Sequence, residues 1–304
     1  MQRHFSLLLA TVGRFHELDS FFHSLTQQTY AFFSVVLVDQ NDDETFLRPL
    51  IERYTKTFKI IYLRSPKGLS RARNLGLKYC IGDIVCFPDD DCEYPKDLLF
   101  EVNNIFNGSN CDIVIGRQTP LEGYVYGSPP SFAEKIKLRF SSRKSHENIY
   151  TLFSDAPSIS LFFSQEAVLR TGNFDETLGA GAGTPWGSGE DTDYIVRAHL
   201  AHCRIERHRN LAIRHPTAIY SKSTFSKALA YGRGRGRLLR KHELGLLFCL
   251  QNIAYPILKG IGKLPDTTAM LYYFLMSLGR VHGFFQSIGQ KKATSHKDNS
   301  ITPR

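Results

Sequence analysis

Short apolar runs alternate with amphipathic segments over the first two thirds of the chain. Apolar runs bounded by turn residues predict buried strands at 5–12, 34–38, 58–63, 84–87, 112–115, 158–163 and 211–214. Helical spacing between them predicts helices at 14–29, 44–54, 95–106 and 165–171, the first with one apolar face formed by Leu18, Phe21, Phe22 and Leu25. Such alternation is typical of βαβ units, so we expect an α/β fold with a mostly parallel sheet.

The pattern becomes purely helical from about residue 225. Apolar stretches at 244–258 and 268–278 fall short of the roughly 20 residues that a membrane-spanning helix needs. Their basic flanks favour helices lying on a membrane face or a partner, and an ordinary helical subdomain is the alternative. We expect a first domain at 1–224, a basic helical segment at 225–292 and a disordered tail at 293–304.

Two segments in the first domain lack the strand and helix pattern. Residues 117–150 are rich in Pro and Gly and then basic, which predicts an inserted loop. Residues 179–189 begin with alternating glycines and contain Trp186, the single tryptophan of the chain. Binding specificity is expected in such loops.

Charge and cysteine content narrow the function classes. The net charge is +9, but residues 226–304 alone carry +10 and residues 1–225 carry −1. A basic segment implies an anionic partner, and its position in a helical tail argues against nucleic acid. The six cysteines show no metal-type spacing, and the apolar run at 7–12 is not followed by a cleavage site, so we expect a cytoplasmic protein.

Three consecutive carboxylates, Asp89, Asp90 and Asp91, follow the apolar run at 84–87. Ligands of open α/β sheets bind beyond the carboxyl ends of strands, and a soluble core accepts such a cluster only beside a cation or strong donors. Carboxylate oxygens suit Mg2+ or Mn2+, usually together with substrate phosphates. The cluster therefore predicts a metal-diphosphate site, with an acidic surface turn as the alternative.

Further candidate residues follow other strands or open helices. Thr11 and Arg14 come after the first strand, and Asp39 ends the second. Lys67 and Arg73 surround a helix start, where anions are favoured. Glu190 and Asp191 open a late helix after the glycine-rich loop, although first-turn acids are also favoured by the helix dipole alone.

The segments LLLATVGR, VVLVDQNDD, KGLSRARNLGL, IVCFPDDDCEYP, GNFDETLGAG, GEDTDY and IRHP make the chain similar to family 2 glycosyltransferases of the GT-A fold over about residues 5–217. The resemblance implies a nucleotide-sugar site at Thr11, Arg14, Asp39, Lys67, Arg73, Asp89 and Asp90. It implies metal ligation by Asp91 and His215, with Asp191 as catalytic base beside Glu190. Trp186 is then a sugar or acceptor contact, or alternatively a core anchor.

Two departures from the family pattern matter. Gln40 and Asn41 follow Asp39, where a second acid and a small-residue turn are usual, so the nucleobase contact is open. No Trp follows the Glu190-Asp191 pair, which excludes the Q-x-x-R-W element of processive members and favours transfer of a single sugar.

The resemblance and the chemistry together predict a metal-dependent, inverting glycosyltransferase. Its donor is a nucleotide sugar and its acceptor a glycan or lipid-linked saccharide, in bacterial surface polysaccharide synthesis at the inner face of the membrane. A divalent ion stabilises the leaving diphosphate, and a carboxylate takes the acceptor proton. The alternatives are a sugar-phosphate nucleotidyltransferase and a non-catalytic peripheral membrane protein with a degenerate core.

Overall fold

The computed structural model describes residues 1–121, 147–217 and 220–286. The chain divides into two compact units, Met1–Ile219 and Tyr220–Arg304, which we describe separately. The division expected from the sequence, at residue 224, stays a proposal. Most of the loop expected at 117–150, including its basic run, and the tail expected at 293–304 lie outside the described residues.

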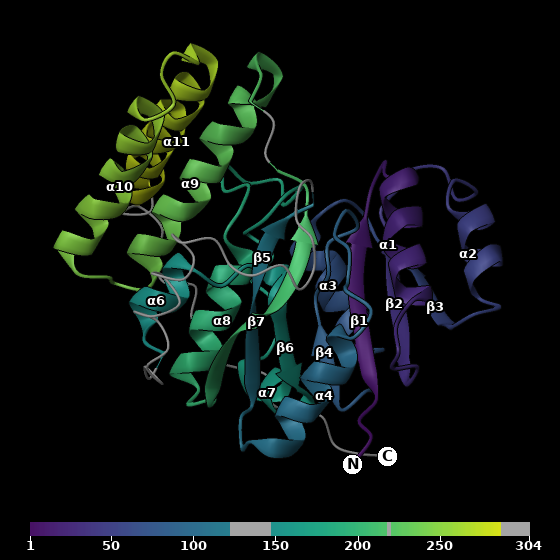
Figure 1. The fold of residues 1–304 in the computed structure, drawn as a ribbon. Helices are drawn as coiled ribbons and strands as arrows, with labels where there is room; N and C mark the ends of the chain where they lie inside the picture. The colour runs from purple at the N-terminus through teal and green to yellow at the C-terminus, as the bar shows by residue number, and fades with distance from the viewer. Residues whose placement is uncertain (122–146, 218–219, 287–304) are drawn as a thin grey trace. The chain divides into compact units, whose positions relative to one another are not determined.

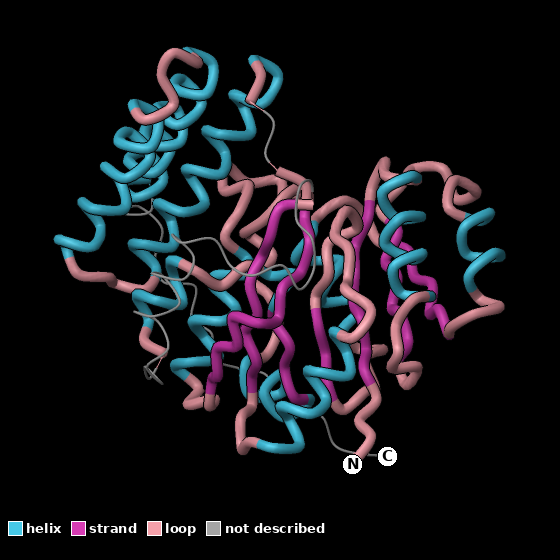
Figure 2. Tube along the Cα trace, in the orientation of Figure 1, coloured by secondary structure: helices cyan, strands magenta, loops and turns pink. Residues whose placement is uncertain are grey.

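The first unit is built on a seven-stranded sheet (Figures 1 and 2). Its strand order is β3-β2-β1-β4-β6-β5-β7, and only β6 runs antiparallel to its neighbours. The strands are β1 (Phe5–Thr11), β2 (Phe33–Asp39), β3 (Lys59–Arg64), β4 (Ile84–Cys86), β5 (Ile113–Pro120), β6 (Leu161–Ser164) and β7 (Ile205–His215). The expected α/β fold with a mostly parallel sheet is confirmed.

Helices cover both faces of this sheet. They are α1 (His16–Thr26), α2 (Arg48–Tyr54), α3 (Leu69–Leu77), α4 (Leu98–Gly108), α6 (Ile149–Ser154), α7 (Gln165–Thr171) and α8 (Glu190–Leu200). The apolar face of α1 packs with α2, α4 and the Phe5, Leu7 and Leu9 side of β1 in one buried cluster. Side chains alternate along a strand, so Leu8 points to the other face and meets α3 at Gly76. Burial on both faces explains the continuous apolar runs.

Six strands run in one direction, which brings their carboxyl ends to one edge of the sheet. Thr11 at the end of β1 pairs with Asp39 at the end of β2, and β4 pairs in parallel with β1. The end of β7 at His215 pairs with Pro120 at the end of β5. Glu93, just beyond the aspartate cluster, forms a bridge with Arg214. This bridge holds the segment after β4 against the end of β7.

Several boundaries differ from the sequence prediction. β5 continues to Pro120 and β7 begins at Ile205, because polar residues are tolerated where β7 forms the edge of the sheet. Residues Ser158–Ser160 form a 3-10 turn rather than strand, and α4 begins at Leu98 rather than at Pro95. Part of the expected loop is the helix α6, whose Asn148 side chain caps the first turn.

Within residues 220–286, the second unit contains three α-helices, α9 (Phe225–Lys241), α10 (Leu246–Ile261) and α11 (Thr267–Gln286). α9 and α11 cross with backbone against backbone. A Cβ at Gly236 would lie 2.1 Å from the Arg280 carbonyl oxygen, and one at Gly283 would lie 2.1 Å from that of Arg233. Only glycine permits this approach. Among the described helices, none has the length and apolarity that crossing a bilayer requires.

Candidate active site

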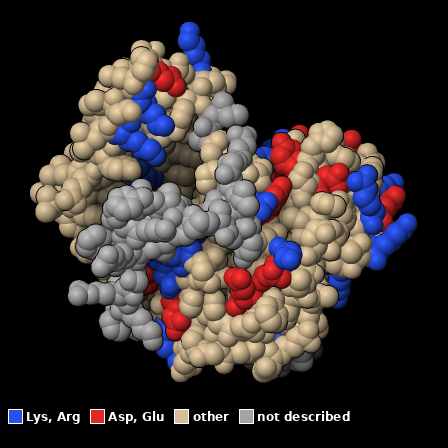
Figure 3. All heavy atoms as spheres, viewed as in Figure 1, with Lys and Arg blue, Asp and Glu red and all other residues tan. Residues whose placement is uncertain are grey.

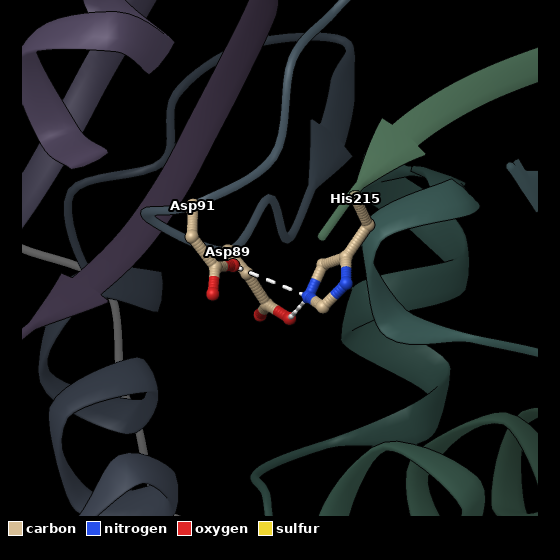
Figure 4. A group of neighbouring side chains, drawn as sticks. All are labelled: Asp89, Asp91 and His215. Atoms are coloured by element: carbon tan, nitrogen blue, oxygen red, sulfur yellow. Dashed lines mark ion pairs between the residues drawn. The ribbon is translucent and has the colours of Figure 1, made fainter. Parts of the chain in front are cut away.

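The segment after β4 and the end of β7 bring two carboxylates and a histidine together (Figure 4). His215 Nε2 lies 3.2 Å from Asp91 Oδ1 and 3.8 Å from Asp89 Oδ2. One ligand atom from each of these three side chains lies within 4.8 Å of the others. The predicted metal ligands Asp91 and His215 are therefore neighbours, and Asp89, expected to bind the nucleotide sugar, lies in the same cluster.

The carboxylates beside His215 affect its titration. His215 Nδ1 donates to the Pro216 carbonyl oxygen, 2.8 Å away, which leaves Nε2 of the neutral ring with a lone pair beside two carboxylates. Burial alone would lower the pKa of His215, but the hydrogen bond and charge of Asp91 outweigh it and raise the pKa. A proton or a divalent ion satisfies these facing acceptors, and imidazole with carboxylates suits Mn2+ or Zn2+.

Arg14 and Thr11 fix the middle of the aspartate cluster. Thr11 Oγ1 donates to Asp90 Oδ2 at 2.6 Å, and Arg14 Nη1 contacts Asp90 Oδ1 at 2.8 Å. The same guanidinium nitrogen also pairs with Asp91. Burial raises the pKa of Asp90 to about 6, despite the opposing effects of Arg14 and Thr11. Thr11 and Arg14 were predicted as nucleotide contacts, and in this structure their polar atoms bind the carboxylates.

Arg73 lies beneath the site as a buried cation, with 2% of its side chain exposed. Its guanidinium nitrogens lie 3.5 Å from Asp89 Oδ1 and 3.4 Å from Glu190 Oε1. The group also lies over the Phe174 ring, 5.4 Å from its centroid. Arg73 thus joins the cluster after β4 to the first turn of α8, while its predicted contact with the nucleotide stays a prediction.

Glu190 is a buried carboxylate at the start of α8. It is buried, and burial together with the neighbouring Asp191 raises its pKa to about 7, although Arg73 acts in the opposite direction. Gly179 lies against it with a φ of +99°, and a Cβ there would be 3.0 Å from Glu190 Oε2. Glycine is needed at position 179 because of the positive φ and because the backbone approaches the Glu190 carboxylate closely.

Asp191 is half-buried at the start of α8, and its Oδ1 accepts a hydrogen bond from the Thr192 backbone nitrogen at 2.7 Å. It lies near enough to Asp89 to contribute to the raised pKa of that group, of which burial is the largest cause. The carboxylate expected to act as base therefore lies near the cluster of Asp89, Asp91 and His215.

The glycine-rich loop closes over the start of α3. Leu69 N donates to Ala180 O at 2.9 Å, and Ser70 Oγ donates to Leu178 O at 2.7 Å. These bonds occupy groups at the helix start where the sequence suggested an anion site. Trp186 in the same loop is only 3% exposed. This burial favours the core-anchor interpretation in this conformation, and its contact with a sugar stays a prediction.

Asp39 is fully buried at the end of β2, and three contacts fix it. Oδ1 accepts from Asn41 N at 2.8 Å and from Asn41 Nδ2 at 2.6 Å, and Oδ2 accepts from Tyr62 OH at 2.7 Å. Sequence analysis missed Tyr62, which carries no signal beyond its place in a strand. Lys67 pairs with Asp42 at 2.8 Å in an exposed position. A pocket of about 340 Å3 opens here, lined by Gln40, Asn41, Asp42, Arg64, Ser65, Pro66 and Lys67.

Two glycosyltransferases match parts of this chain in sequence. An uncharacterized glycosyltransferase of Haemophilus influenzae is 28% identical over 142 residues, which are 43% of this chain and 45% of that protein. The glycosyltransferase AglE of Haloferax volcanii is 23% identical over 186 residues, 60% of this chain and 59% of that protein. The alignments thus span about half the length of each of these curated relatives.

Solved structures and a family model extend the comparison. The mannosyltransferase PcManGT of Pyrobaculum calidifontis, in complex with GDP-Man and Mn2+, matches with a TM-score of 0.64 and 13% identity over 96% of this chain and 89% of that chain. S. aureus TarS 1-349 with UDP-GlcNAc matches with a TM-score of 0.55 and 16% identity over 92% and 89%. These likenesses confirm the GT-A-like fold. The model for glycosyl transferase family 2 matches residues 6–165, more than half of the sequence, and the chain belongs to this family.

Proposed function

We propose that the chain is a metal-dependent glycosyltransferase that moves a single sugar from a nucleoside diphosphate donor to a hydroxyl group. The acceptor is a glycan or lipid-linked saccharide, and the anomeric carbon is inverted. The observation that carries the proposal is the cluster of Asp89, Asp91 and His215, within 4.8 Å of one another at the carboxyl edge of the sheet. Membership of glycosyl transferase family 2 supports the same reaction class.

Asp91 and His215 would hold the divalent ion, with Asp89 as a further oxygen ligand. Mn2+ or Mg2+ in this position supplies Lewis-acid stabilisation of the charge that develops on the leaving diphosphate. The protein's own contribution is to fix the ligands. The Pro216 carbonyl oxygen orients the imidazole of His215, and Arg14 orients Asp91 from its other side.

Asp191 takes the proton of the acceptor hydroxyl as the new bond to the anomeric carbon forms and the bond to the diphosphate oxygen breaks. A base on the face opposite the leaving group gives inversion. Glu190 precedes Asp191 in the chain, and burial together with the charge of Asp191 raises its pKa. Arg73, which contacts both Asp89 and Glu190, holds the donor and acceptor sides of the site in one arrangement.

The donor class is supported by the structural relatives. S. aureus TarS binds UDP-GlcNAc, and PcManGT binds GDP-Man with Mn2+, so both uridine and guanosine donors are to be tested. The pocket beside Asn41, Arg64 and Lys67 is the position that we propose for the nucleoside. We place the reaction in polysaccharide assembly at the inner face of a bacterial membrane, which the basic C-terminal segment supports.

A thermal-shift panel of UDP, GDP, CDP and dTDP, each with and without Mn2+, tests the proposal. Ligands that bind the native state raise its stability by RT ln(1 + [L]/Kd), about 2.7 kcal/mol at one hundred times Kd. We expect one nucleotide to stabilise the protein only with metal, and Asp91→Asn to abolish the shift. The matched control is Glu52→Gln, an exposed acid on α2. No shift with any nucleotide, or an equal shift in Asp91→Asn, would reject the proposal.

A further inference from the structure

The helix α10 carries a row of exposed apolar side chains. Leu246, Leu247, Leu250, Leu258 and Ile261 are each more than half exposed, and we call them the α10 face. At 3.6 residues per turn, these five positions fall on one side of the helix. The opposite side is buried through Cys249, Pro256 and Gly260, and Gly260 meets Met270 and Tyr273 of α11.

This exposure is unusual because a monomeric soluble protein rarely exposes a large contiguous apolar patch. Figure 3 shows uncharged atoms over the region that α10 occupies in Figure 1. A second row on α11, formed by Leu271, Phe274 and Leu278, follows the spacing of one helix face and is also exposed. Both α10 and α11 therefore present apolar side chains to their surroundings.

The charge of the same unit selects among the partners that could cover this face. Residues 220–286 contain ten Lys or Arg and two Asp or Glu, a net charge of +8. Helix α10 itself contains no acidic residue, and Lys259 and Lys263 flank its C-terminal end. A second copy of the chain would bring an equal positive charge to the contact, which opposes association. An anionic lipid surface offers both an apolar phase and the opposite charge.

We infer that the α10 face binds an anionic membrane surface, with α10 lying in the plane of the interface. The leucines enter the boundary between headgroups and acyl chains, while the lysines and arginines of the unit contact the phosphates. Such binding needs no spanning segment. It also does not depend on the sugar-transfer reaction, so it can fail while the proposed function holds.

Vesicle co-sedimentation of the full chain tests this inference. We compare vesicles of phosphatidylcholine alone with mixed phosphatidylglycerol and phosphatidylcholine vesicles. The test variant is the double substitution Leu247→Asp and Leu250→Asp, at side chains that are 71% and 55% exposed. The control is Leu169→Asp with Leu200→Asp in the first unit, at leucines that are 74% and 57% exposed. The two variants match in chemistry, charge change and exposure.

We expect the wild type to sediment with anionic vesicles, less with neutral ones and less at high salt. The α10 variant should lose more than about tenfold in partitioning, whereas the control changes by less than about twofold. Equal losses in both variants, or no binding of the wild type to anionic vesicles, would overturn the inference. If the wild type and the control are dimers that do not bind vesicles and the α10 variant is a monomer, the α10 face would instead bind a second copy of the chain. The nucleotide thermal shift should be the same in all three proteins.

Discussion

The Nε2 atom of His215 lies 3.2 Å from Oδ1 of Asp91, although 124 positions separate the two residues in the chain. We expect His215→Ala to weaken metal-dependent binding of the nucleotide about ten- to a hundredfold, because it removes one of the three proposed ligands and substitutions around metal sites cost this much affinity. Titration with Mn2+ at fixed nucleotide, followed by thermal shift, measures the change. The control is His208→Ala on the same strand, where the imidazole pairs with Glu206. Equal effects of the two substitutions would show that His215 is structural.

Removal of the buried guanidinium of Arg73 should be costly. Arg73→Leu leaves Asp89, which is 36% exposed, and the buried Glu190 without their shared cation. For the buried pair with Glu190, losing one partner costs about 3–5 kcal/mol. Arg71→Leu on the same helix removes a half-exposed ion pair with Glu176, worth about 0–1 kcal/mol, and an exposed hydrogen bond to the Lys67 carbonyl oxygen. Denaturant unfolding of both variants gives the comparison. A loss for Arg73→Leu no larger than that for Arg71→Leu would contradict the bridging role.

Glu190 should make the free energy of unfolding depend on pH. Its folded pKa of about 7 lies above its ordinary value of 4.5, so between these values the folded protein holds a proton that the unfolded chain has released. Stability therefore falls as the pH rises through this window, by up to about 1.4 kcal/mol per pH unit from this group. Glu190→Gln should flatten the profile between pH 5 and 7, and the exposed Glu166→Gln should leave it unchanged. Parallel profiles for wild type and Glu190→Gln would refute the assignment.

The crossing of α9 and α11 should not tolerate a methyl group. In Gly236→Ala the new Cβ would lie 2.1 Å from the carbonyl oxygen of Arg280, so the helices must separate, at a cost of about 1–3 kcal/mol. Gly262→Ala is the control, because its Cβ would meet nothing nearer than 3.6 Å. Thermal unfolding followed by circular dichroism compares the two. Unchanged unfolding of Gly236→Ala would mean that the close crossing does not form.

Local periodicity predicted most of the first unit. The four apolar residues of α1, Leu18, Phe21, Phe22 and Leu25, are all buried, as their spacing indicates. The extension of β5 from Arg117 to Pro120 escaped prediction because these residues pair with β7, which lies almost a hundred positions later. Residues 117–120 are not apolar enough alone to indicate a strand. Their pairing depends on tertiary contacts that a short window does not contain.

The sequence predicted the positions of site residues that follow the ends of strands. It did not predict the contacts of residues that are buried by side chains from distant segments. The order of the segments placed Asp89, Asp91 and His215 at one edge of the sheet, and there they meet. Arg73 was expected beside phosphates because it follows a helix start. Its burial depends on the Phe87 and Phe174 rings, which reach it from other segments. No rule of spacing links an arginine to aromatic rings so far away in the sequence.

The alternation of glycine and arginine in α9 also fixes the alignment of the helix pair. Where the backbones touch, the next residues along the chain are Arg233, Arg237 and, on α11, Arg280. A shift of α9 by one residue would place Tyr231 or Arg233 where Gly232 lies, and Arg235 or Arg237 where Gly236 lies. A large side chain would then meet the backbone of α11. Steric overlap therefore opposes the neighbouring alignments of α9 and α11, and the glycine positions favour the one alignment that the structure shows.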